Sequence, residues 1–184
     1  MNELYFWHPV GAHSGESFSE IIDRKKNEIL KYGYTIWSFA PISKNRDFFW
    51  RKELSSINEI DVLCSGGNNK APGNNNSSPI WMKEYSIDMN TWNKLPENIT
   101  SYHKGPNKNG IVASGFYVKE INTKTIYFKR PKIWLDQDGK WINSEMSTRG
   151  EFMIKSPEVG SLTEKYSNIV CQLLLIKPFF VWLR

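Results

Sequence analysis

The residue types best suited to chemistry at the start of the chain lie in one short loop, from His8 to Ser17, which contains histidine, serine and glycine. The loop runs directly into a predicted helix, whose first turn presents unpaired N–H groups and a partial positive charge. Such a loop can hold a phosphate or carboxylate, with His13 as donor or proton carrier and Ser14 beside it. Alternatively, Ser14 and Ser17 only cap the helix, because no GxxxxGK[ST] or GxGxxG pattern is present.

A second candidate is the segment from Lys124 to Lys132, which mixes cations and aromatics without an acid and is followed by two tryptophans. Cations contact phosphates and aromatic faces stack on unpaired bases, which is how single-stranded nucleic acid is commonly held. We expect a binding surface with Lys129, Arg130 and Lys132 at phosphates and with Tyr127, Trp134 or Trp141 stacked on a base. The alternative is ordinary strand alternation, with Ile126 and Phe128 inward and Tyr127 and Lys129 outward.

The sequence contains no complete motif for a metal site or a catalytic nucleophile. The three histidines, His8, His13 and His103, do not have the spacing of a familiar zinc site, and no serine stands in GxSxG. Cys64 and Cys171 form no CxxC pair, which indicates two free thiols in a reducing compartment. We therefore expect no metal and no cofactor. If the chain is an enzyme, we expect a phosphorylated or nucleotide substrate with His13 as acid or base at the helix end.

Composition favours one domain with much of its length in strands. Of the 184 residues 14% are aromatic, and flat side chains suit the half-buried surface of a sheet. The net charge of +5 permits an anionic partner without requiring one. The N-terminus lacks the pattern of a secretory signal and no apolar run is long enough to span a bilayer, so we expect a cytoplasmic protein without a membrane segment. The abundant Trp and Phe leave a protein-interaction domain as a further alternative.

The clearest element that must position these residues is a helix from about Ser17 to Tyr32. Ser17 and Glu20 have the spacing of a capping box, and Gly33 stands where a left-handed cap is needed. The apolar residues of the helix fall on one face and its cations mostly elsewhere; they are Phe18, Ile21, Ile22 and Ile29, and Arg24, Lys25, Lys26 and Lys31. Short strands are expected at Leu4 to Trp7 and at Tyr34 to Phe39.

Further along, Asp47 is expected to cap a second short helix that leads into a strand at Asp61 to Cys64. Residues 65–79 form a flexible polar loop with almost nothing to bury. The chain then reads mostly as strands, and Asp136-Gln-Asp-Gly139 between two Trp-containing strands predicts a hairpin turn. These elements predict an α+β domain over residues 1–184 with a curled, mostly antiparallel sheet or small barrel and one or two helices near the N-terminus.

One stretch carries a family resemblance. The strand Gly110 to Ile121, after the basic loop 103–109, resembles the glycine-marked strand of PUA-like barrels, the superfamily that contains the ASCH and EVE domains. The resemblance covers about a dozen residues and implies a barrel that binds RNA or a modified base in a cleft lined by aromatics. We expect a binding module for nucleic acid or a nucleotide-like anionic ligand, with single-stranded nucleic acid or a nucleotide as partner.

Overall fold

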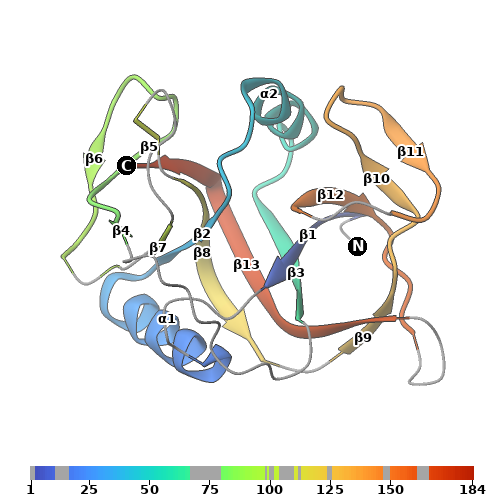
Figure 1. The fold of residues 1–184 in the computed structure, drawn as a ribbon, viewed down its shortest axis with the longest axis horizontal. Helices are drawn as coiled ribbons and strands as arrows, with labels where there is room; N and C mark the ends of the chain where they lie inside the picture. Colours follow the sequence, from blue (N-terminus) through green and yellow to red (C-terminus); the bar gives the residue numbers. More distant parts are fainter. Residues whose placement is uncertain are drawn as a thin grey trace. The chain divides into compact units, whose positions relative to one another are not determined.

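The computed structural model describes residues 3–10, 17–66, 80–97, 99, 102–103, 110–111, 113–123, 126–146, 150–160 and 166–184 (Figure 1). These residues form two helices and a mostly stranded, mixed sheet, which confirms the α+β part of the predicted fold class. The helices are α1 (Phe18–Tyr32) and α2 (Lys44–Glu53). The strands are β1 (Leu4–Val10), β2 (Thr35–Phe39), β3 (Glu59–Gly66), β4 (Ile80–Trp81), β5 (Glu84–Ser86), β6 (Asn93–Lys94), β7 (Tyr102–His103), β8 (Ala113–Asn122), β9 (Ile126–Lys129), β10 (Ile133–Leu135), β11 (Trp141–Asn143), β12 (Phe152–Lys155) and β13 (Tyr166–Leu183).

Helix α1 begins and ends as its sequence predicts. The side chain of Ser17 accepts from the Glu20 N–H while the Glu20 carboxylate accepts from the Ser17 N–H, which completes the capping box. Gly33 adopts φ +80, and its N–H donates to the Ile29 carbonyl. The buried face of the helix differs from the expected apolar face, because Lys25 and Glu28 are buried together with Ile22.

Helix α2 begins earlier than predicted. Its N-cap is Ser43, whose hydroxyl accepts from the Arg46 N–H at 3.2 Å, and not Asp47. Asp47 lies one turn inside the helix, where its carboxylate accepts from Nε of Arg51 at 2.9 Å. The serine was the better cap because it precedes the first helical residue, whereas Asp47 has an i, i+4 cation within reach.

The chain divides into two compact units, each assembled from three separate segments. Unit 1 contains residues 1–11, 43–68 and 121–174, and unit 2 contains residues 12–42, 69–120 and 175–184. Strand β13 contributes residues to both units, because the boundary falls between Leu174 and Leu175.

In unit 1, β1 is the central strand, because it runs parallel to β3 on one side and antiparallel to β12 on the other. Strands β10 and β11 continue the sheet beyond β12 as the predicted hairpin, with Gly139 at φ +75 in the turn. Helix α2 packs on this sheet through Trp50, whose ring lies 4.7 Å from that of Phe6. A cluster of apolar side chains fills the unit, including Trp7, Leu63, Phe128, Phe152, Ile154 and Ile169.

In unit 2, α1 packs beside β2, which pairs antiparallel with β8 (Figure 1). The last residues of β13 pair with β5, which in turn pairs with the two-residue β6. Rings stack between β2 and β8, where Phe39 and Phe116 lie 4.3 Å apart. The apolar cluster of this unit consists of Ile36, Met82, Leu95, Ile99, Ala113, Val181 and Leu183.

The sheet is mixed and open in the part of the chain that the structure describes. Strands β11 and β6 stand at the two ends of the pairing order, each with one neighbour, so the predicted small barrel is not closed there. Only Ser65 and Gly66 of the predicted polar loop are described, as the end of β3, and the rest lies outside the described residues. Neither described helix has the length and apolar character that crossing a membrane requires.

Gly115 tests the packing of β2 against β8 and β13. A Cβ atom at this position would overlap Cγ2 of Ile36 and lie 3.0 Å from Cδ1 of Leu183. We expect Gly115→Ala to lower the free energy of unfolding by about 1–3 kcal/mol in urea titrations, because the added methyl overpacks the core.

A double-mutant cycle gives the control. Ile36→Ala removes the overlapping atom, so its combination with Gly115→Ala should be less destabilised than the two single effects added together. Gly33→Ala, where no atom lies within 4 Å and only the positive φ is strained, should be additive with Ile36→Ala. An additive Gly115→Ala cycle would contradict the packing argument.

Candidate functional site

The structure places the predicted cation and aromatic residues of the second candidate in unit 1, on three strands. Tyr127 and Lys129 are in β9, Arg130 and Lys132 are in the connection to β10, Trp134 is in β10 and Trp141 is in β11. In β9 the side chains alternate as described for an ordinary strand, with Ile126 and Phe128 in the apolar cluster of the unit and Tyr127 and Lys129 half-buried on the other side.

Two of the three predicted phosphate contacts have carboxylate partners. Lys129 Nζ lies 3.4 Å from a Glu158 oxygen, and an Arg130 nitrogen lies 3.6 Å from a Glu145 oxygen. Both glutamates are more than half exposed, so these are surface pairs of small energy. Lys132 is exposed. The surface therefore carries cations and acids side by side.

The strand register puts the two tryptophans of this surface on opposite faces of the sheet. Trp134 pairs with Ile142, and Trp141 pairs with Leu135, so the two rings belong to alternating positions. The Trp134 ring packs edge-on against Phe152 at 5.2 Å and its N–H donates to the Ser144 carbonyl. The Trp141 ring has Lys155 Nζ 4.1 Å from its centroid. One ligand cannot stack on both rings.

The loop with His13 and Ser14 lies outside the described residues, so its predicted role stays a prediction. Cys64 is described and fully buried in β3. Burial raises the pKa of its thiol, and the neighbouring Cys171 thiol raises it further, which fits a buried strand residue and not a nucleophile. No group of three metal-ligating side chains occurs among the residues that the structure describes.

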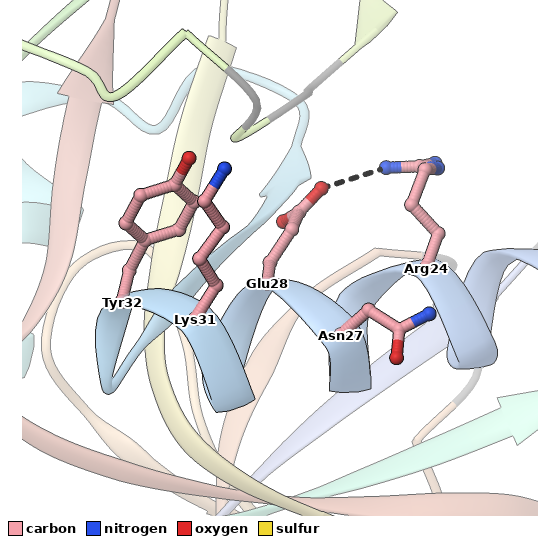
Figure 2. Close-up of a pocket in the computed structure, with 5 residues that line it drawn as sticks. All are labelled: Arg24, Asn27, Glu28, Lys31 and Tyr32. Carbon is pink, nitrogen blue, oxygen red and sulfur yellow. Dashed lines mark hydrogen bonds and ion pairs between the residues drawn. The ribbon is translucent and has the colours of Figure 1, made fainter.

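A hollow lies along α1 in unit 2, with a volume of about 350 Å³. Figure 2 shows four of its side chains rising from the same side of the helix, and Asn27 on the flank. The described residues that line it are Arg24, Asn27, Glu28, Lys31 and Tyr32. They recur at spacings of three and four because positions three and four apart share a helix face. The hollow thus presents two cations, an amide, a carboxylate and a phenol.

A buried polar network fixes the floor of this hollow. Glu28 is 4% exposed, and its two oxygens have different partners. One oxygen accepts from Arg24 at 3.3 Å, and the other accepts from Lys25 Nζ at 3.1 Å and from the Thr35 hydroxyl. Lys25 also donates to the Ile36 carbonyl at 2.7 Å, which ties α1 to β2. The single carboxylate is therefore outnumbered by the cations Arg24, Lys25 and Lys31.

Tyr32 connects the hollow to a group of four half-buried tyrosines on the apolar cluster of unit 2, namely Tyr32, Tyr34, Tyr85 and Tyr117. The rings of Tyr34 and Tyr117 are stacked, with centroids 4.5 Å apart and planes 10° apart. Burial, together with the neighbouring phenols, raises the pKa of Tyr34 to about 12. Burial also raises the pKa of Tyr117. The raised pKa values of Tyr34 and Tyr117 mean that these two phenols keep their protons to higher pH than an exposed tyrosine does.

The two units differ in net charge. Unit 2 has 12 Lys and Arg residues against 8 Asp and Glu, whereas unit 1 has 12 against 11. Nearly all of the net charge of +5 therefore belongs to the unit that contains the α1 hollow. An anionic ligand is attracted by the summed charge of the unit as well as by single contacts.

The sequence pattern places the α1 cations mostly away from the apolar face of the helix and does not predict the hollow. A signal was present, because Arg24, Glu28 and Lys31 share one helix face with Tyr32. The burial of Lys25 and Glu28 could not be read from that pattern, since charged residues are rarely buried unless they are paired. Glu28 accepts from Thr35 and Lys25 donates to the Ile36 carbonyl, and both of these partners belong to the next strand.

The buried network gives a first test of this site. Lys25→Met leaves Glu28 without its closest cation in a buried position, so we expect the free energy of unfolding to fall by about 3–5 kcal/mol. The double variant Lys25→Met/Glu28→Gln replaces the charge by a neutral amide that still accepts from Thr35, and should regain at least half of the loss. Urea unfolding of both variants checks this, and equal instability of the two would contradict it.

The tyrosine group predicts a dependence of stability on alkaline pH. The pKa of Tyr34 is about 12 in the folded chain and about 10 when unfolded, so the folded state retains the proton longer. The resulting stabilisation is complete below about pH 10 and is lost as pH rises towards 12. Thermal unfolding across this range should show a shallower decline for Tyr34→Phe than for the parent. Parallel declines would show that Tyr34 does not contribute.

Comparison with protein-family models, with curated proteins and with solved structures gave no match. The resemblance of Gly110 to Ile121 to PUA-like barrels therefore stays a prediction.

Proposed function

We propose that the chain is a binding module for a nucleotide-like anionic ligand, either a free nucleotide or a base of a nucleic-acid strand, and that the α1 hollow of unit 2 is its site. The observation that carries this proposal is the combination, on one helix face, of cations with a tyrosine that opens a larger group of aromatic rings. Cations for phosphate and an aromatic face for a base are the two contacts such a ligand needs.

Each lining side chain has a role in this proposal. Lys31 Nζ lies 5.1 Å from the centroid of the Tyr32 ring, so a phosphate at Lys31 places the attached sugar and base beside that ring. Arg24, two turns earlier on the helix, is oriented by Glu28 and supplies a second cationic contact. Asn27 offers an amide donor and acceptor to a base edge.

The size of the hollow favours a small ligand. A volume of about 350 Å³ is at the lower end of the range for small-molecule sites and suits one nucleotide unit. A longer strand would extend beyond the hollow and depend on the general positive charge of unit 2.

The surface of β9 to β11 remains a second place for nucleic acid. Its pairs Lys129–Glu158 and Arg130–Glu145 are exposed, and exposed pairs contribute only about 0–1 kcal/mol, so phosphates can replace the glutamates. The protein-interaction alternative has less support, because Phe48 is the one aromatic among the exposed large hydrophobic side chains of the described residues.

Fluorescence anisotropy with short single-stranded and double-stranded DNA and RNA, at about 50 and 200 mM salt, tests the function. Binding to single strands that weakens with salt and is displaced by nucleoside monophosphates supports the proposal. Absence of binding to every oligonucleotide and to the monophosphates would overturn it.

The site is tested by charge reversal at matched positions. Lys31→Glu should weaken binding about tenfold or more and reduce the salt dependence by about one phosphate contact, because it removes one cation–phosphate contact and adds repulsion. Lys26→Glu makes the same change of charge on α1 outside the lining of the hollow and should have a much smaller effect. Reversal of Lys129, Arg130 and Lys132 to Glu should leave binding close to that of the parent. The opposite ranking would move the site to β9–β11.

A further inference from the structure

A different group of polar side chains, in unit 1, is not used by the proposed function. It consists of His8 in β1, Glu151 directly before β12, and Arg46 in the first turn of α2. The pairing of Trp7 with Phe152 brings the next positions, His8 and Glu151, next to each other across the two strands. They belong to the same sheet face as Phe6, which packs against Trp50 of α2.

His8 and Glu151 form a buried pair. His8 is 5% and Glu151 8% exposed, and the His8 Nδ1 lies 3.0 Å from Oε1 of Glu151. The Glu151 side chain is thereby hydrogen-bonded to His8 on the neighbouring strand. Glu151 lies close enough to Arg46 to favour the charged form of the arginine, but the two side chains form no ion pair.

Arg46 is held by aromatic rings and not by an acid. Its guanidinium carbon lies 5.7 Å from the Trp50 ring centroid and 5.2 Å from that of Phe152. The guanidinium has no hydrogen bond or ion pair within the described part of the chain. The other described arginines each have a carboxylate partner: Arg24 with Glu28, Arg51 with Asp47, Arg130 with Glu145 and Arg184 with Glu84.

A partly buried guanidinium without an acid partner is energetically unfavourable. Burial lowers the pKa of Arg46 and so disfavours its charged form, which an accepting partner would offset. Ring contacts orient the planar guanidinium while its N–H groups stay available, and these groups match the two oxygens of a carboxylate or phosphate. A partly buried, oriented and unpaired guanidinium is what a site for an oxyanion requires.

We propose that Arg46, in contact with the rings of Trp50 and Phe152 and near the His8–Glu151 pair, binds the oxyanion group of a ligand, a carboxylate or a phosphate. The His8–Glu151 pair acts as a positioning element, because Oε1 of Glu151 pairs with His8 and Glu151 forms no ion pair with Arg46, which leaves the guanidinium for the ligand. This site is built from residues of unit 1 and does not rest on the function proposed for unit 2.

The test measures binding of inorganic phosphate and of acetate separately, by the rise in unfolding temperature of the full chain, with sodium chloride at equal ionic strength as reference. We expect one of the two anions to stabilise the parent beyond chloride. Stabilisation by phosphate alone assigns a phosphate ligand, and stabilisation by acetate alone assigns a carboxylate ligand. No stabilisation by either anion would overturn the proposal.

Variants on the same helix localise the effect. Arg46→Met should lower the affinity for the stabilising anion at least tenfold. Arg51→Met removes the same charge from α2 and should keep the affinity of the parent. Arg46→Lys keeps the charge and loses the planar fork, so it should bind several-fold more weakly than the parent. Equal response of the Arg46→Met and Arg51→Met variants would show a general effect of charge and contradict the site.

Two further measurements keep the proposal testable if Arg46→Met does not fold. In the parent, the Arg46 Nε–H resonance should shift on titration with the effective anion, and an unchanged resonance would overturn the assignment. Lys31→Glu, in the α1 hollow, should leave this response intact. Loss of the response in Lys31→Glu would place the bound anion at the α1 hollow instead.

Discussion

Unit 2 depends on one buried charge. Glu28 is a buried residue on the face of α1 that meets β2. A carboxylate in such a position is tolerated only if its oxygens accept hydrogen bonds or pair with cations. Lys25, Arg24 and Thr35 supply the donors, and Lys25 continues to the Ile36 carbonyl, so the network fixes the position of the helix on the strand. The same network orients Arg24 in the hollow. In the proposed function, one carboxylate therefore serves both the packing of the helix and the orientation of a ligand-binding cation.

Most of the aromatic side chains described above pack elements together inside a unit. Phe6 and Trp50 join α2 to the sheet of unit 1, and Phe39 with Phe116 joins β2 to β8 in unit 2. Some rings also contact cations: the half-buried Trp141 lies beside Lys155, and the buried Trp50 and Phe152 lie beside Arg46. At these positions a ring can orient a cation without neutralising it, which an acid cannot do.

Local signals were sufficient for much of the fold. The capping box of Ser17, the cap at Gly33 and the hairpin turn at Gly139 are short-range features whose physics is contained in a few neighbouring residues. Long-range features were not predictable in this way. The parallel pairing of β1 with β3, the assembly of each unit from three segments and the burial of Glu28 depend on residues far apart in the chain. The α1 hollow was missed for the same reason, since its floor depends on Thr35.

Whether a cation can bind an external anion depends on what already neutralises it. Lys129 and Arg130 looked suitable in the sequence because no acid stands within their segment, but Glu145, after β11, and Glu158, after β12, lie beside them. At α1 one glutamate is shared among several cations, and at Arg46 aromatic rings take the place of a carboxylate. Positive charge is therefore more available at these two positions than on the segment from Lys124 to Lys132, and local composition alone is a poor guide to anion binding in this chain.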